Sequence, residues 1–401
     1  MDLIDISSVR DSADALRGVL NPTPAFHSPS LSTRLGTTLW IKPEYRQRTG
    51  SFKFRGAYWK ASGLPTRSHL VAGSAGNHAQ GVALAAQRLG HSATIFMPDS
   101  ASLPKVAATR GYGASVEVGG ATVDDAIERA RAFAQSRGAV FVPPFDDVRI
   151  IEGQATIGLE LCAEVPEVDA VLVAVGGGGL CAGVAAAIKA TRPEVNVIGV
   201  AAEGANSIVA SLNAGHPISV VPATVADGIA LKAPTELTLA HIDAFTDEIV
   251  TVSDDAIAAA MILLLERAKA VVEPAGAAAL AALLCEPRLA TQFRTIAVVC
   301  GGGNVDPLLL SKCIDHGLVA LGRFCHLRVL VEDSPGSLAQ LCEVLAAQGI
   351  NVVEVTHVRN SPGIGLRDVQ ISVLVETRDR DHGLAGVAEL RQRGFQVVVV
   401  D

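Results

Sequence analysis

The chain has 401 residues, of which 49% are hydrophobic and 18% charged, and its mean hydropathy is +0.36. This composition excludes a disordered or coiled-coil protein, and the length predicts roughly two or three domains. The 33 basic and 41 acidic residues give a net charge of −8, which excludes the basic surface that a nucleic-acid partner requires.

The beginning of the chain carries no targeting pattern. MDLIDISSVR contains acidic residues, and no apolar signal core follows it, so we expect a cytoplasmic protein. The longest apolar runs, such as 257–265, are far shorter than the roughly 20 residues that cross a bilayer, and we therefore expect no membrane partner.

The first candidate for chemistry is the segment RTGSFKFRGA at 48–57. Lys53 lies between Phe52 and Phe54, where partial desolvation lowers the pKa of an amine and favours Schiff-base formation with an aldehyde. Lysines are mostly exposed, and two arginines flank this one, so an ordinary surface lysine explains the segment equally well in isolation.

Between about residues 68 and 320, β-branched runs alternate with Ala-rich segments, which is typical of a parallel sheet covered by helices. The predicted strands are 69–72, 92–97, 115–118, 168–175, 195–201, 248–252 and 295–300, with helices that include 79–89, 121–137 and 254–269. Several strands end in glycine, at Gly73, Gly176 and Gly301. Ligands of α/β sheets bind at the carboxyl ends of the strands, so these turns indicate one crevice.

The segment VAGSAGNHAQG at 71–81 runs from a strand through small residues into a helix. Backbone N–H groups at such a helix start can approach an anion, and Asn77 offers both a donor and an acceptor. A plain helix cap by Ser74 or Asn77 is the more frequent explanation of such a segment taken alone.

Four consecutive glycines, 176–179, join an apolar strand to an apolar helix. Their bare N–H groups at a positive helix end suit a phosphate, whereas a flexible linker between two buried elements makes little sense. Residues 177–182 also satisfy G-x-G-x-x-A, and Glu203 follows near the end of the next strand. A nicotinamide-dependent oxidoreductase is therefore the second hypothesis.

A further strand and glycine turn, TIAVVCGGGNVD, occupies 295–306. A buried structural cysteine is the default interpretation of Cys300. If the crevice holds a pyridine ring, we expect the thiol to be a neutral hydrogen-bonding partner of the ring nitrogen.

After about Gly322 the pattern changes to strand, helix, strand, strand, helix, strand within about 77 residues, which predicts a ferredoxin-like unit. The seven cysteines include no Cys-x-x-Cys pair, and the ten histidines form no His-Glu-x-x-His motif. We therefore expect neither a disulfide framework nor a metal site.

Together these segments resemble the fold-type II pyridoxal-phosphate enzymes, specifically the threonine/serine dehydratases. The matching motifs, in the family's order over about residues 20 to 310, are KPEYRQRTGSFKFRGA, SAGNHAQGVA, MPDSASLPKVAATRGYGASV, PPFDDVRIIEGQATIGLEL, VGGGGLCAGVA, TVADGIALKAPTELT, EPAGAAALAAL and CGGGNVD. The tail, with its DSPGSL turn, resembles the ACT domain, a module that senses small molecules. The resemblance implies two doubly wound parallel-sheet subdomains in residues 1–322, the small one inserted at about 50–150, and an ACT regulatory domain at 323–401.

The resemblance also implies a cofactor, pyridoxal 5′-phosphate, and a role for each motif. Lys53 would bind the cofactor covalently and later remove the Cα proton of the substrate, and Phe52 would pack on the ring. Asn77 would bind the 3′-oxygen, with Glu273 and Cys300 near the ring. The phosphate would be held by Gly176, Gly177, Gly178, Gly179 and Leu180. The substrate carboxylate would be bound by Ser74, Ala75, Gly76, Asn77 and His78.

The implied reaction is loss of water and ammonia from L-threonine or L-serine, giving 2-oxobutanoate or pyruvate, as in isoleucine biosynthesis. Gly301 stands where threonine dehydratases carry a serine, which leaves threonine, serine and 3-hydroxyaspartate open as substrates. Ala75 has no proton to give, which disfavours racemisation. Glu203 matches a cation ligand of racemase-like members, but Val209 stands where a further acidic ligand would be, so no metal is expected.

Two features of regulation follow from the same resemblance. We expect isoleucine or valine as an effector at the ACT domain, and a homodimer or homotetramer. An inactive amino-acid sensor built on the ACT module is the third hypothesis.

Overall fold

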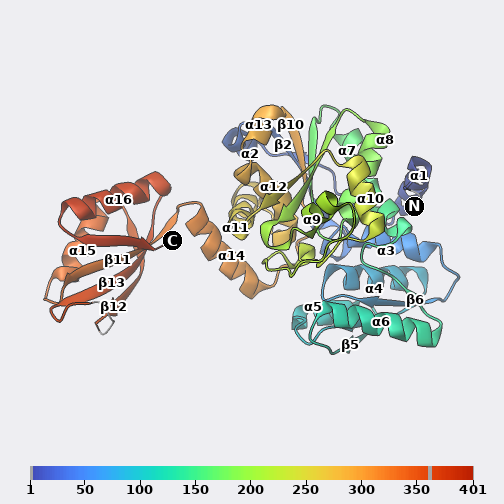
Figure 1. Ribbon diagram of the computed structural model, residues 1–401, viewed down its shortest axis with the longest axis horizontal. Helices are drawn as coiled ribbons and strands as arrows, with labels where there is room; N and C mark the ends of the chain where they lie inside the picture. Colours follow the sequence, from blue (N-terminus) through green and yellow to red (C-terminus); the bar gives the residue numbers. More distant parts are fainter. Residues whose placement is uncertain (1–2, 360–363, 401) are drawn as a thin grey trace. The chain divides into compact units, whose positions relative to one another are not determined.

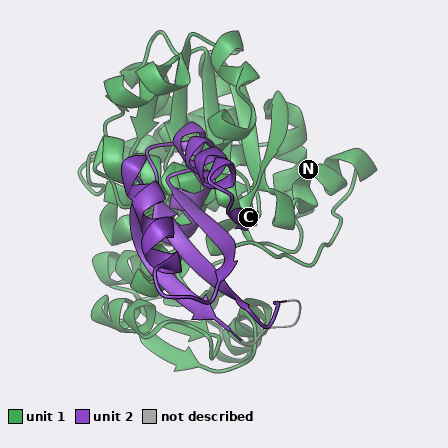
Figure 2. Cartoon of the chain, turned by 90° about the vertical axis from the view of Figure 1, so that its left-hand side faces the viewer, with its two compact units in different colours: residues 1–310 green, residues 311–401 purple. Residues whose placement is uncertain are grey.

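The computed structural model describes residues 3–359 and 364–400, and the chain divides into two units, residues 1–310 and 311–401 (Figure 2). The first unit contains two parallel sheets, and the second contains one antiparallel sheet (Figure 1). Helix α14 (Pro307–Ala320) spans the division, and the first strand of the second unit begins at Phe324, beside the boundary expected after residue 322. These sheets confirm the predicted α/β fold with a C-terminal βαββαβ unit.

The large subdomain of the first unit is built on a six-stranded sheet with the order β1-β2-β10-β7-β8-β9. All neighbours are parallel except β1 and β2. β7 and β10 are buried at every residue, as expected of parallel strands covered on both faces. The strands are β1 (Phe26–His27), β2 (Thr38–Lys42), β7 (Ala170–Ala174), β8 (Asn196–Ala202), β9 (Glu248–Val252) and β10 (Thr295–Val299).

Helices cover this sheet, and two of them end at a glycine. Gly36 and Gly215 end two of the helices in the left-handed conformation that glycine adopts without steric cost. The helices are α1 (Ile6–Leu16), α2 (Pro29–Leu35), α7 (Val148–Glu164), α8 (Gly179–Thr191), α9 (Ser207–Ala214), α10 (Glu236–Phe245), α11 (Asp254–Leu263), α12 (Pro274–Cys285) and α13 (Arg288–Gln292). Short helical turns are η1 (Glu44–Arg46), η2 (Arg48–Gly50), η3 (Glu203–Ala205), η4 (Asp227–Ile229) and the π-helical η5 (Leu264–Ala268).

The small subdomain is built on a four-stranded parallel sheet with the order β5-β4-β3-β6. Its strands are β3 (His69–Gly73), β4 (Ser92–Met97), β5 (Ser115–Val118) and β6 (Val140–Phe141), and its helices are α3 (Lys53–Ser62), α4 (Asn77–Leu89), α5 (Leu103–Gly111) and α6 (Val123–Arg137). Phe54, Ala57 and Ala61 of α3 belong to the same buried cluster as Leu70 and Ala72 of β3. The apolar face of α3 is therefore part of the core of the small subdomain.

The second unit is an antiparallel sheet with the order β12-β13-β11-β14 and its own apolar core. Leu341 and Leu345 of one helix and Val387 and Leu390 of the other belong to that core. Its elements are β11 (Phe324–Glu332), α15 (Ser337–Ala347), β12 (Asn351–Val358), β13 (Asp368–Glu376), α16 (Arg380–Gln392) and β14 (Gln396–Val400).

The strands predicted at 92–97, 115–118 and 248–252 agree with the observed bounds, and the others differ by one or two residues at an end. No strand was predicted before residue 68, yet β2 pairs in parallel with β10 near one edge of the large sheet. Among the described residues, no helix combines the length and the apolar character that spanning a membrane requires. The cytoplasmic location stays a prediction.

Candidate active site

Lys53 is the first residue of α3, and backbone contacts to the end of β10 hold the segment that precedes it. Ser51 forms an isolated bridge with Gly302, and the N–H of Phe52 donates to the carbonyl oxygen of Gly301 at 3.0 Å. The start of α3 is thereby held beside the glycine turn at 301–303, although more than 240 residues separate the two segments in the sequence.

The Lys53 side chain is half-buried and points into the protein. Its Nζ donates to the carbonyl oxygen of Pro144 at 2.8 Å and lies 5.2 Å from the centroid of the Phe52 ring. Burial lowers the pKa of Lys53 to about 8, although the nearby Glu273 raises it. The unprotonated amine, which is the form that attacks a carbonyl carbon, is therefore far more abundant at neutral pH than in an ordinary lysine.

The glycine loop, residues 176–179, joins β7 to α8. Gly178 has a φ of +93° and precedes α8 without any side-chain cap, so the first N–H groups of this helix are available to an anion. A Cβ on Gly176 would lie 2.7 Å from the backbone Cα of Ile229, and a Cβ on each of the other three would also meet an atom closer than 3.0 Å. Any residue larger than glycine would therefore clash with the segments that pack against this loop.

A second loop at a helix start, residues 74–78, joins β3 to α4. His78 is buried, and its Nε2 lies 2.8 Å from the carbonyl oxygen of Val142. Burial and the neighbouring Lys53 lower the pKa of His78 to about 3. The imidazole is therefore neutral at physiological pH, and its Nε2–H donates to Val142, which holds the side chain in place.

Glu273 stands at the N-cap position of α12 but makes no capping hydrogen bond. Instead its Oε1 accepts from Nδ2 of Asn77 at 2.6 Å, and Oδ1 of Asn77 accepts from Nδ2 of Asn304 at 2.7 Å. Burial and the charge of Asp227 raise the pKa of Glu273 to about 7. Glu273 therefore does not act as a helix cap, and its carboxyl group is held by Asn77 instead.

These segments line one cavity of about 200 Å³. The predicted site residues in its wall are Phe52, Lys53, Ser74, Ala75, Gly76, Asn77, His78, Gly176, Gly177, Gly178, Gly179, Leu180 and Glu273. The structure thus brings together an amine, a glycine loop at an uncapped helix start and a carboxyl group from both subdomains.

Cys300 is the one predicted site residue that does not line this cavity. A Cβ on Gly301 would lie 3.3 Å from the Phe52 ring and 3.7 Å from Leu180, so position 301 faces the cavity. Cys300 is fully buried, and its carbonyl accepts from the N–H of Tyr45. Burial raises the pKa of the thiol to about 12. Cys300 therefore corresponds to a neutral buried cysteine outside the cavity wall, and the contact between its thiol and a ring in the cavity stays a prediction.

Lys105 and Asp227 also line the cavity, although they were not predicted as site residues. Lys105 extends from α5 of the small subdomain, and its Nζ lies 3.1 Å from Oδ2 of Asp227 in η4 of the large subdomain. Lys105 lies in the segment SLPKVAATRG and Asp227 in TVADGIALK, which are both parts of motifs that resemble the family. Membership in these motifs was the sequence signal that could have identified the two residues. The pair joins the two subdomains across the cavity.

We expect Lys105→Met and Asp227→Asn each to raise the KM for substrate about two- to fivefold. An exposed ion pair contributes about 0.2–1 kcal/mol, and Asp227 is 59% exposed, so the effect must be small. Steady-state kinetics at low and high salt measure it. High salt should raise the KM of the unaltered enzyme toward that of the variants. A salt-independent KM in the unaltered enzyme would contradict this interpretation.

Comparison with known proteins places this geometry in a family. Residues 16–301 match the model described as "Pyridoxal-phosphate dependent enzyme", and residues 326–395 match the ACT domain. The chain is 42% identical to an L-threonine ammonia-lyase of Thermotoga maritima, over 99% of this chain and all of that protein. A second L-threonine ammonia-lyase, from Geobacter sulfurreducens, is 40% identical over the same shares.

Solved structures agree with these matches. The processed form of threonine deaminase isoform 2 from Solanum lycopersicum is 36% identical, with a TM-score of 0.74 over 78% of this chain and 93% of that one. A serine racemase from Dictyostelium discoideum is 30% identical, with a TM-score of 0.71 over 76% and 99%. The chain therefore belongs to the family of pyridoxal-phosphate-dependent enzymes and carries an ACT domain after its catalytic unit.

Proposed function

We propose that this protein is a threonine ammonia-lyase, which converts L-threonine to 2-oxobutanoate and ammonia and L-serine to pyruvate and ammonia. The single observation that carries the proposal is that Lys53 and the glycine loop at 176–179 line the same cavity. Relatives named L-threonine ammonia-lyase match the chain from end to end, which supports threonine as the substrate. The family match leaves little support for the nicotinamide-dependent alternative.

The residues of the cavity fit pyridoxal phosphate. A ligand with an aldehyde and a phosphate needs a free amine and an anion site at the two ends of one cavity. Lys53 supplies an amine whose pKa is lowered to about 8, and the N-terminus of α8 supplies N–H groups from a loop that tolerates only glycine. The apolar ring of Phe52 lies beside the amine.

When bound, the cofactor withdraws electrons from the Cα–H bond of the amino acid. Lys53 would take the Cα proton on its Nζ, because a buried amine with a pKa near 8 can both accept and release a proton at neutral pH. The N–H groups and small side chains of residues 74–78 would orient the substrate carboxylate. Asn77, held by Glu273, would orient the ring oxygen.

A keto-acid assay with L-threonine, L-serine and 3-hydroxyaspartate tests the proposal. We expect turnover of threonine or serine that depends on added pyridoxal phosphate. Ala75 offers no proton on the face opposite Lys53, so no D-amino acid should accumulate. Binding of amino acids without release of ammonia would instead favour the sensor hypothesis.

The pH dependence of cofactor attachment provides a separate test. As the pH rises through about 8, covalent incorporation of pyridoxal phosphate into the protein should become faster, since only the unprotonated amine attacks the aldehyde. The depressed pKa makes this amine available more than two units below the ordinary lysine value of 10.5. Glu273→Gln should move the midpoint to lower pH, because Glu273 raises the pKa of Lys53. A midpoint above about 10 would contradict the burial of the amine.

The ACT domain indicates an amino-acid effector, and we propose isoleucine or valine for it and a homodimer or homotetramer for the assembly. An effector of this kind typically couples to a distant site by about 1–3 kcal/mol, which is a roughly 5- to 150-fold change in apparent affinity. Threonine kinetics with and without each amino acid, combined with sedimentation, measure the coupling. Identical curves and an unchanged sedimentation coefficient would exclude both amino acids as effectors.

A further inference from the structure

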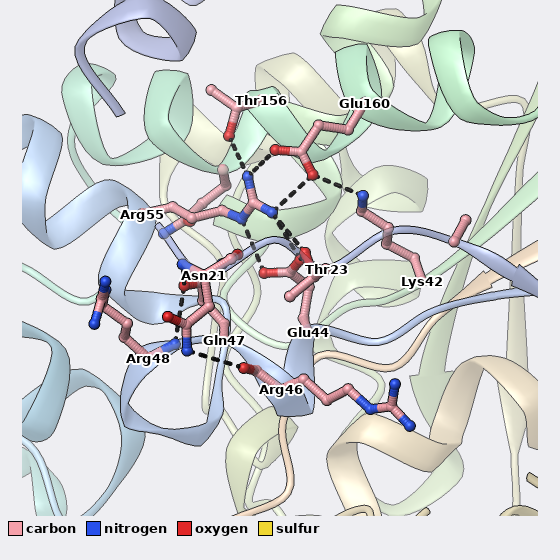
Figure 3. Close-up of polar contacts among 12 residues, drawn as sticks. Asn21, Thr23, Lys42, Glu44, Arg46, Gln47, Arg48, Arg55, Thr156 and Glu160 are labelled. Carbon is pink, nitrogen blue, oxygen red and sulfur yellow. Dashed lines mark hydrogen bonds and ion pairs between the residues drawn. The ribbon is translucent and has the colours of Figure 1, made fainter. Parts of the chain in front are cut away.

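A buried cluster of opposite charges surrounds the Arg55 side chain (Figure 3), and its members do not line the cavity. We call it the ion cluster, and its charged members are Lys42, Glu44, Arg55 and Glu160. Lys42, Glu44 and Arg55 are at most 1% exposed, and Glu160 is 33% exposed. Two positive and two negative groups make the cluster neutral, and Glu164 adds a further partner for Lys42 at its edge.

Arg55 occupies the centre of this cluster, and three segments of the chain accept its hydrogen bonds. Its Nε and Nη2 donate to the two oxygens of Glu44 at 2.9 and 2.8 Å, and its Nη1 and Nη2 donate to those of Glu160 at 2.5 and 2.8 Å. Thr156 accepts from Nη1 at 3.0 Å, and Thr23 accepts from Nη2 at 3.1 Å. The planar guanidinium is held in a single orientation by two bidentate carboxylates.

The electrostatics of the ion cluster favour the charged forms of Arg55 and Glu160. Burial disfavours the charged form of Arg55, but Glu44 and Glu160 outweigh it, so its pKa is raised. Burial also opposes ionisation of Glu160, yet Arg55 and Lys42 lower its pKa to about 2. Arg55 and Glu160 are therefore both ionised at neutral pH.

The ion cluster connects the two subdomains where α3 packs against α7. Arg55 belongs to α3, whose apolar face lies in the core of the small subdomain. Its partner Glu44 follows β2, and its partner Glu160 lies on α7. Ile157 and Leu161 of α7 belong to the core of the large subdomain. Arg55 is thus the most deeply buried ionic tie of the lysine-bearing helix to the subdomain that carries the glycine loop, and Lys60 of the same helix makes a more exposed one with Asp147.

The first turn of α3 is held by the buried ring of Phe54 and by the N–H of Gly56, which donates to Oε1 of Gln154 at 3.3 Å, but the start of the helix has no side-chain cap. Phe52 caps it without a side-chain hydrogen bond, and no acidic residue stands in the first turn. The backbone contacts of Ser51 and Phe52 hold the segment that precedes Lys53. Because Lys53 and Arg55 lie two residues apart on one turn, a fixed guanidinium also fixes the direction of the lysine side chain.

We propose that Arg55 is the positioning residue of Lys53, holding the first turn of α3 against β2 and α7 so that Nζ faces the glycine loop. This inference rests on the proposed function, in which Lys53 binds the cofactor. The role of Arg55 is to position Lys53 and not to contact the substrate, since Arg55 does not line the cavity. A displacement of about 1 Å at a reacting group can cost on the order of 100-fold in rate, which is the scale expected here.

Arg55→Met and Lys42→Met in the full-length holoenzyme test the proposal as a matched pair. Both remove one buried cation from the same cluster, but only Arg55 is on the lysine helix. We expect both variants to melt at lower temperature, and only Arg55→Met to lose kcat about 100-fold with a KM for threonine within about threefold of the original. Per bound cofactor, the visible circular dichroism should change in Arg55→Met and stay unchanged in Lys42→Met.

Two milder variants keep the test decisive if Arg55→Met does not fold. Thr156→Val removes one hydrogen-bond acceptor of Arg55 without altering charge. Arg55→Lys keeps the charge but loses the planar guanidinium that binds two carboxylates at once. Each should lose less kcat than Arg55→Met, and its visible circular dichroism should change in the same direction as that of Arg55→Met. Equal kcat and equal dichroism in Arg55→Lys, Thr156→Val and the unaltered enzyme would overturn the positioning role.

Borohydride reduction followed by peptide mapping separates failure of this inference from failure of the proposed function. Cofactor mass on Lys53 of the unaltered enzyme, together with unaffected kcat in the Arg55 variants, would refute only the positioning role. Cofactor mass on another lysine would refute the proposed function itself, whatever the Arg55 variants do.

Discussion

Lys53→Ala is expected to lower kcat for threonine by about 10⁴-fold or more, and to abolish covalent retention of pyridoxal phosphate after borohydride reduction. The variant removes both the amine that binds the cofactor and the group that takes the Cα proton, and a proton-transfer group alone contributes roughly 10²- to 10⁴-fold. Keto-acid release and the mass of the reduced protein are the measurements. The protein should still fold, because the ammonium makes one hydrogen bond, to Pro144.

Lys60→Ala is the matched control for this prediction. Lys60 lies on the same helix and forms an ion pair with Asp147 at 2.7 Å, but it does not line the cavity. It should retain both the covalent cofactor and most of the activity. Activity in Lys53→Ala comparable to that in Lys60→Ala would refute the assignment of Lys53.

Gly178→Ala is expected to weaken binding of pyridoxal phosphate about 5- to 150-fold. Gly178 has a φ of +93°, and a Cβ there would lie 2.8 Å from Cβ of Thr238, so the loop must shift. Overpacking of this kind costs about 1–3 kcal/mol, and the shift displaces the N–H groups at the start of α8. Titration of the visible band of the bound cofactor gives the dissociation constant, and inorganic phosphate should compete less well in the variant.

Gly90→Ala separates strain from loss of the anion site. Gly90 also has a positive φ, +70°, but a Cβ at this position would meet no atom within 4 Å, and the residue is outside the cavity. It should lose some stability and bind the cofactor with unchanged affinity. Equal affinities in Gly178→Ala and the unaltered protein would show that the loop does not hold the phosphate.

Most of the α/β fold could be predicted because its strands are short apolar runs separated by glycine turns. The C-terminal unit could be predicted for the same reason, since β13 alternates between buried and half-buried residues along most of its length. The strand β2, which lies before residue 68, was not predicted. β2 is only five residues long and ends in Lys42, so its sequence lacks the apolar run that marks the other strands of this sheet.

The orientation of Cys300 illustrates a limit of sequence patterns. Every residue of β10 is buried, because helices cover both faces of a parallel sheet. An unbroken apolar run gives no alternation from which to read which side chains face the cavity. The direction of position 301 follows only from its contacts with Phe52 and Leu180.

By itself the sequence determined the order of the elements, the glycine turns at the strand ends and the candidate lysine, because these depend on residues that are neighbours in the chain. Only the tertiary structure decided that Lys42 and Arg55 are buried. In sequence they look like surface residues, and charged groups stay buried only when partners compensate their lost hydration. Part of that compensation comes from Glu160, 105 residues beyond Arg55, which only the folded chain brings within hydrogen-bonding distance.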